Sequence, residues 1–173
     1  TVSVSAGYGH TCAITEKSST EEIGEPFCWG GNGNGQIGDG TNHDRSTPVQ
    51  VNLPGGRIAS SLSAGGQHTC AVLDDASLKC WGSNQNGQLG DGTTTSSNEM
   101  IAVTLPSGRT ADSVSSGESH TCAVLDDGSA YCWGYNNYGQ LGDGTITDSS
   151  TPVAVSLPTG RTVPALDTDS DGD

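Results

Sequence analysis

The chain has 173 residues, of which 31% are hydrophobic and 26 are glycine, with one Phe and one Met. This composition excludes a large conventional core and favours tight turns over helices. The formal net charge of −14 disfavours binding to nucleic acids or anionic membrane surfaces, whose phosphates would be repelled. No apolar run reaches the roughly 20 residues of a membrane helix, so we expect no membrane insertion.

The chain consists of three copies of one repeat. Cysteines 28, 80 and 132 are spaced 52 residues apart, and each is followed by Trp-Gly. A His-Thr-Cys triplet precedes each of them, but the first two triplets are 58 residues apart instead of 52. We place the extra residues within 15–26 and interpret them as a lengthened surface hairpin loop. The expected units are blade 1 at 1–56, blade 2 at 57–108, blade 3 at 109–160, and the start of a further strand with an acidic tail at 161–173.

Each repeat contains a run of turn residues followed by a strand pattern. The turn run reads Gln-Ile/Leu-Gly-Asp-Gly-Thr and begins at Gln36, Gln88 and Gln140. Apolar residues then alternate with other residues, as in Val49-Gln50-Val51, and this period of two predicts half-buried β-strands.

These motifs resemble the regulator of chromosome condensation repeat family, whose signatures are G-x-x-H-T and W-G-x-N-x-x-G-Q-L-G-x-G. The match covers nearly the whole chain in three copies. The resemblance implies an all-β fold of tandem, antiparallel four-stranded blades arranged around an axis, as in a β-propeller. Family propellers close with about seven blades, so three blades are not expected to close a ring by themselves. The cysteines depart from the nuclear members and indicate a bacterial-type, extracytoplasmic variant.

The cysteines are expected to form one disulfide in each blade. A hairpin with Asp126-Asp127-Gly128 as its three-residue loop places Cys122 opposite Cys132, at the short separation that a disulfide requires. Each bond would contribute about 3 kcal/mol by the loop-closure argument. The predicted pairs are Cys12 with Cys28, Cys70 with Cys80, and Cys122 with Cys132.

A metal site is the alternative for the same residues. His68 and Cys70 lie two residues apart on one strand with Cys80 opposite, and three ligands of this type could hold zinc. The disulfide is better supported, because the resemblance gives the histidine a structural role even in relatives that lack the cysteines.

Three further residue types recur once per blade, and we interpret them as structural. A single Trp after the central strand is typical of packing between blades. The arginines are expected to form ion pairs within or between blades with the recurring Asp39, Asp91 and Asp143. The recurring residues are His10, His68 and His120; Trp29, Trp81 and Trp133; and Arg57, Arg109 and Arg161.

No catalytic motif is found, so we do not expect an enzyme. The acidic tail places oxygen donors at alternate positions before a glycine, which is the spacing of the first half of a calcium loop. Calcium is therefore the only cofactor considered, and a solvated acidic linker is the equally weighted alternative. The candidate ligands are Asp167, Asp169, Asp171 and Asp173.

Disulfides favour an oxidising compartment, so we expect an extracellular or cell-surface protein. The chain opens at Thr1 without a signal sequence, which indicates either a removed signal or a fragment. Unclosed blades expose sheet edges and apolar faces that need a cover. We therefore expect a structural protein that associates with copies of itself, as a ring or filament, with Thr1 to Val4 or Arg161 to Leu166 completing a neighbour's blade. The alternative is a recognition module of a larger surface propeller that binds a protein or a glycan.

Overall fold

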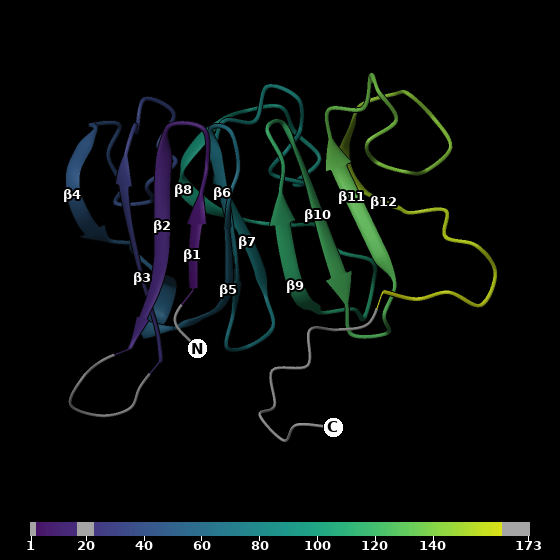
Figure 1. Ribbon diagram of the computed structural model, residues 1–173, viewed down its shortest axis with the longest axis horizontal. Coiled ribbons are helices and arrows are strands. Elements are labelled where there is room, and N and C mark those ends of the chain that lie inside the picture. Colours follow the sequence, from purple (N-terminus) through teal and green to yellow (C-terminus); the bar gives the residue numbers. More distant parts are fainter. Residues whose placement is uncertain (1–2, 17–22, 164–173) are drawn as a thin grey trace.

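The repeats fold into three antiparallel sheets that stand side by side along the molecule (Figure 1). The computed structural model describes residues 3–16 and 23–163. Each sheet has four strands, and each strand pairs with the next one along the chain. The all-β fold of four-stranded blades is therefore confirmed, and the three described sheets do not close a ring (Figure 1).

The strands recur at equivalent places in each blade. The first blade contains β1 (Ser3–Ala6), β2 (His10–Glu16), β3 (Ile23–Gly30) and β4 (Arg45–Gln50). The second contains β5 (Ala59–Ala64), β6 (His68–Leu73), β7 (Leu78–Gly82) and β8 (Ser97–Ala102). The third contains β9 (Ala111–Ser116), β10 (His120–Leu125), β11 (Ala130–Gly134) and β12 (Ser149–Ala154). The only helical element in the described ranges is a short 3-10 turn, η1 (Pro54–Gly56). Among those residues, no helix is long and apolar enough to cross a membrane.

The first blade departs from the expected hairpin. Strand β2 continues to Glu16 and β3 begins at Ile23, with Thr15 paired with Glu25 across the ladder. Part of the 15–26 segment therefore extends the two strands, and its interpretation as a surface loop was wrong for these residues. Continued pairing satisfies the backbone hydrogen-bonding groups that a loop would leave to water.

The apolar core lies in the seams between adjacent blades. One buried cluster joins the first two blades and contains Ile14, Leu73 and Trp81. A second joins the last two blades and contains Val72, Leu125 and Trp133. Because each sheet contributes only one thin layer to a seam, a core of this type is possible with the low apolar content of the chain.

The two ends of the blades carry different kinds of connection. One end, which we call the loop face, is formed by residues 7–9 and 31–44 and by the equivalent segments of the other blades, 65–67, 83–96, 117–119 and 135–148. It lies at the top of Figure 1. The opposite hairpin end carries the turns between the second and third strands and the connections from one blade to the next.

Candidate functional site

A histidine from each of the first two blades reaches across the seam to the next blade. His10 Nε2 lies 2.8 Å from Thr69 Oγ1, and Thr69 Oγ1 donates to the carbonyl of Gln36 at 2.7 Å. Since the threonine hydroxyl has only one hydrogen, it must accept from the histidine, which fixes the hydrogen of His10 on Nε2. The second seam repeats this relay: His68 Nε2 lies 2.8 Å from Thr121 Oγ1, which donates to the carbonyl of Gln88.

The tryptophans join the same relay. Trp81 Nε1 donates to the carbonyl of Gln36 in the preceding blade at 2.9 Å, and Trp133 Nε1 donates to that of Gln88 at 2.9 Å. Both rings are 0% exposed, whereas Trp29 is half-buried. Trp81 and Trp133 are thus parts of the seams and are not available to an external ligand.

Burial keeps these histidines neutral. It lowers the pKa of His10 to about 4. Burial, together with repulsion from His10 and His120, lowers the pKa of His68 to about 3. The Nδ1 atoms of His10 and His68 are buried without a hydrogen-bond partner. A proton added there would be a buried charge without compensation, so these rings are structural groups and unsuited to proton transfer near neutral pH.

The cysteines form three disulfides, each between directly opposed residues of the second and third strands. The Cα atoms are 4.1 Å apart in Cys12–Cys28 and in Cys70–Cys80, and 4.0 Å apart in Cys122–Cys132. No thiolate is left for zinc, and the described part of the chain contains no group of three or more His, Cys, Asp or Glu residues placed to hold a metal. The calcium candidates Asp167, Asp169, Asp171 and Asp173 lie outside the described residues, so that assignment stays a prediction.

Each long loop of the loop face is built around a buried asparagine that sequence reasoning missed. Asn84 is fully buried, and its Nδ2 donates to the carbonyls of Thr93 at 3.2 Å and Thr95 at 3.1 Å. Its Oδ1 accepts from the backbone N–H of Leu89 at 2.9 Å. The recurrence of Trp-Gly-x-Asn was the available signal, but the segment was interpreted only as a set of turns. The equivalent residues Asn32 and Asn136 make the same types of contact.

The expected ion pairs between the recurring arginines and Asp39, Asp91 or Asp143 are wrong for the described pairs. Arg57, just before β5, instead contacts Asp74 at 3.5 Å and Asp75 at 3.1 Å in the hairpin between β6 and β7. Arg109 makes the equivalent contacts with Asp126 at 3.6 Å and Asp127 at 2.9 Å. These arginines lie at the hairpin end, whereas the expected aspartates lie on the loop face, a strand length away.

Asp39 has a nearer partner on its own loop. Arg45 Nε donates to Asp39 Oδ2 at 2.6 Å, and Thr41 also donates to this carboxylate. Burial raises the pKa of Asp39, but the hydrogen bonds from Thr41 and Arg45 outweigh it and hold the pKa below its usual value. The carboxylate of Asp39 therefore stays ionised, and its contacts with Arg45 and Thr41 stabilise the loop.

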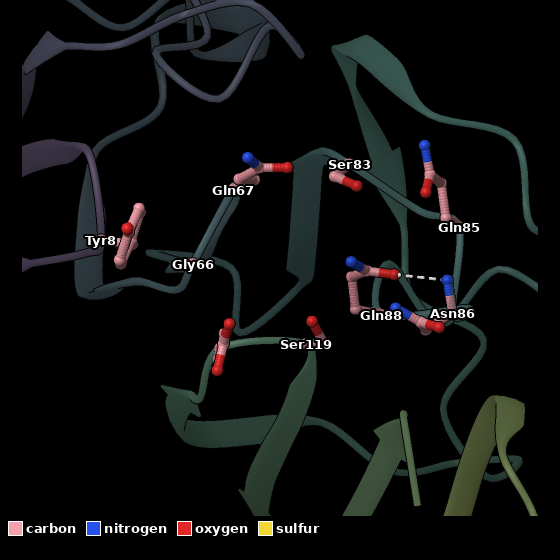
Figure 2. A pocket seen from close by; sticks show the side chains of 9 residues that line it. Tyr8, Gly66, Gln67, Ser83, Gln85, Asn86, Gln88 and Ser119 are labelled. Atoms are coloured by element: carbon pink, nitrogen blue, oxygen red, sulfur yellow. Dashed lines mark hydrogen bonds between the residues drawn. The ribbon is translucent and has the colours of Figure 1, made fainter.

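The loop face contains a hollow of about 350 Å³ to which all three blades contribute. Figure 2 shows Tyr8 on one side, Gln67 and Ser83 along another, Gln85 on the far side, and Ser119 below. Polar groups from all three blades converge on this concave site. Neither the strand pattern nor the repeat spacing indicated it.

Taken together, the stacked four-stranded sheets and their repeated seams define a segment of a β-propeller. Comparison with known families identifies it further: the model described as "Regulator of chromosome condensation (RCC1) repeat" matches residues 24–72, 78–124 and 127–166. The chain belongs to the RCC1 repeat family. A second model with the same description matches residues 59–88 and 111–140.

Several curated proteins are similar to this chain over part of their length. The "Ultraviolet-B receptor UVR8" of Arabidopsis thaliana is 35% identical over 160 residues, covering 92% of this chain and 35% of that protein. The human "Probable E3 ubiquitin-protein ligase HERC4" is 32% identical over 161 residues, covering 89% of this chain and 14% of that protein. The chain thus spans about a third or less of these relatives.

Solved structures show the same fold at lower identity. Human WBSCR16 superimposes with a TM-score of 0.74 at 22% identity, covering 89% of this chain and 40% of that one. Yeast RCC1 (Prp20), solved bound to Kap60, gives a TM-score of 0.75 at 21% identity, covering 91% of this chain and 37% of that one. Kap60 is a partner of the yeast protein.

Proposed function

We propose that this chain is a non-enzymatic, disulfide-stabilised interaction module of the extracellular space or a cell surface, and that its outer blade faces bind a second copy of the chain. The RCC1 repeats support an interaction module built of propeller blades. The disulfides support an oxidising compartment. The burial of His10 and His68 as neutral groups within the seams supports a role in contact and not in catalysis.

The observation that carries self-association is the exposure of Val4. Its side chain is 68% exposed, whereas the equivalent Leu62 and Val114 are each 9% exposed inside seams. Thr11 is half-buried, while its equivalents Thr69 and Thr121 are 0% exposed. The outer face of the first blade therefore carries the apolar and hydrogen-bonding residues of a seam without a neighbouring sheet among the described residues.

The outer face of the third blade carries the complementary groups. His120 and the carbonyl of Gln140 are equivalent to His68 and Gln88, which bind threonine and tryptophan of the following blade in the second seam. A second copy would place Thr11 and Trp29 against these groups in the geometry of the internal seams. The two outer faces are therefore complementary to each other and not to themselves, which favours head-to-tail association.

The mode of contact differs from the strand exchange expected from the sequence. Strand β1 (Ser3–Ala6) pairs with β2 in its own sheet, so Ser3 and Val4 are not free to complete a neighbour's blade. Residues 1–2 and 164–166 of the two segments that were expected to do so lie outside the described residues. Each described blade already has four strands. We therefore propose docking of complete blades, face against face.

Sedimentation velocity across a range of chain concentrations tests this proposal. Assembly predicts a rising average mass, and Val4→Asp should return the chain to monomers because a carboxylate would be buried in the new seam. Ala102→Asp is the matched control, since Ala102 is exposed on β8 at the position where the first blade carries Gln50. A wild-type chain that remains monomeric at every concentration would refute self-association.

A protein or glycan partner is the second candidate function. The hollow on the loop face supports it, because it lies across internal blade seams and does not depend on the outer faces.

A further inference from the structure

The hollow on the loop face has a lining with unusual chemistry for a ligand pocket. Its lining residues are Tyr8, Gly66, Gln67, Ser83, Gln85, Asn86, Gln88, Glu118 and Ser119. Amides and hydroxyls dominate, Tyr8 is the only large apolar surface, and no lining residue is aliphatic. Most small-molecule pockets are lined mainly by apolar groups, so this one suits a ligand that is polar over most of its surface.

The charge of the lining further restricts the class of ligand that the hollow can bind. Glu118 is the only carboxylate, and no Lys, Arg or His lines the hollow. The chain as a whole has a formal net charge of −14. Phosphates, nucleic acids and acidic sugars would be repelled without any compensating cation. The ligand should therefore not carry a negative charge.

Several polar groups of the lining remain available to a ligand. The side chains of Gln85, Glu118 and Ser119 and the hydroxyl of Tyr8 make no hydrogen bond with the described residues. By contrast, Gln88 is already used, because its Oε1 accepts from the backbone N–H of Asn86 at 2.9 Å (Figure 2). The free groups include donors and acceptors, which matches vicinal hydroxyls, since each hydroxyl can both donate and accept.

Tyr8 supplies an aromatic surface beside these groups. Its side chain is 88% exposed at the edge of the hollow, in the loop between β1 and β2 (Figure 2). An exposed ring that is not needed for packing is available to stack against the C–H face of a pyranose. Its phenol oxygen remains accessible to a neighbouring hydroxyl.

The backbone of the hollow is fixed before any ligand arrives. Tyr8 N–H donates to the carbonyl of Gly65 at 3.3 Å, and Gly66 N–H donates to that of Glu118 at 3.1 Å. A Cβ at Gly66 would lie 2.4 Å from the Glu118 carbonyl oxygen, so the close approach of these two loops requires glycine. Hydrogen bonds across two seams thus hold the three loops at fixed separations, which lowers the entropic cost of binding.

The lining occupies positions that differ among the repeats, although the supporting asparagine and glutamine recur in all three. A fixed scaffold with variable residues at the loop surface is the usual arrangement of a recognition site. Self-assembly alone does not require such differences. The variable positions are Tyr8, Gly66 and Glu118; Gly9, Gln67 and Ser119; Gly31, Ser83 and Tyr135; Gly33, Gln85 and Asn137; and Asn34, Asn86 and Tyr138.

We propose that this hollow binds an uncharged saccharide, with one pyranose ring stacked on Tyr8 and its hydroxyls hydrogen-bonded to Gln85, Glu118 and Ser119. A peptide fits less well, because the lining offers no apolar pocket for an anchoring side chain. The inference is independent of self-association, since the hollow lies on internal seams and not on the outer blade faces.

The test is NMR titration of the chain with a panel of neutral oligosaccharides, namely gluco-, xylo-, manno- and galacto-oligomers, with polygalacturonate and an uncharged peptide as further probes. Binding of a neutral glycan should be weakened about tenfold by Tyr8→Ala, on the energy of one aromatic stacking contact. Gln85→Ala should weaken it several-fold through the loss of one neutral hydrogen bond. Both side chains are exposed, so neither substitution should affect folding.

Tyr138→Ala is the matched control. Tyr138 is 86% exposed on the loop face but does not line the hollow, so its removal should leave glycan affinity unchanged. Failure of every neutral glycan to bind, binding of polygalacturonate or the peptide only, or glycan binding that Tyr8→Ala leaves intact would each overturn the proposal. None of these outcomes bears on self-association, which sedimentation measures separately.

Discussion

Acidification should destabilise the blade seams through His10 and His68. Both folded-state pKa values, about 4 and about 3, lie below the ordinary value of 6.5. The unfolded chain therefore binds protons first, and the stability that these groups contribute is fully present above pH 6.5 and is lost as the pH falls towards the folded values. In this pH range, each histidine lowers the free energy of unfolding by about 1.4 kcal/mol for each unit by which the pH falls. At pH 4.5, two units below the unfolded pKa, the two together should cost about 5 kcal/mol.

Urea unfolding at pH 7 and pH 4.5, followed by tryptophan fluorescence, measures this loss, because Trp81 and Trp133 are buried in the seams. His68→Gln keeps a side-chain N–H for Thr121 but cannot titrate, so it should lose only about half as much stability as the wild type. His43→Gln is the control, since His43 is exposed on a loop. The reasoning is refuted if the wild type and His68→Gln lose equal free energy between the two pH values.

Two other perturbations test the internal construction of the blades. Replacing Cys70 and Cys80 together by Ala should lower the free energy of unfolding by about 3 kcal/mol, because the bond closes a sequence separation of 10 residues; urea titration would show an effect close to zero if the cross-link were unimportant. Asn84→Ala should leave the carbonyls of Thr93 and Thr95 and the N–H of Leu89 without their partner. This should lower the free energy of unfolding by about 3 kcal/mol or more. Hydrogen exchange should show faster exchange at Leu89 N–H, with the equivalent Leu141 N–H unchanged in the same sample.

Periodicity was sufficient to find the three repeats, and the family resemblance supplied the four-stranded blades that the structure has. The second and third repeats each join their second and third strands through a short hairpin, and the register derived for Cys122 and Cys132 also places Cys70 opposite Cys80 and Cys12 opposite Cys28. The disulfide partners lie only 10 to 16 residues apart, and the structure has the pairs that this local register predicts. The prediction failed in part for the first hairpin, because some of its inserted residues continue the pairing between β2 and β3. The length of an insertion does not tell whether its residues extend the strands or form a loop.

The ion pairs and the hollow could not be obtained in the same way. Arg57 and Asp39 recur with the same period, but periodicity does not say at which end of a blade a residue lies, and these two lie at opposite ends. The hollow combines Tyr8, Gln85 and Glu118 from three different blades, so its chemistry exists only after the blades have stacked.

The sequence by itself determined the repeat, the hairpin register and the disulfide pairs, because these depend on residues close together in the chain. The tertiary structure decided which groups meet across a seam. His10 acquires its role from Thr69 and Gln36, and its low pKa from burial by a neighbouring blade. Contacts between blades depend on how one rigid sheet is rotated and displaced against the next, and no spacing within a single repeat contains that information.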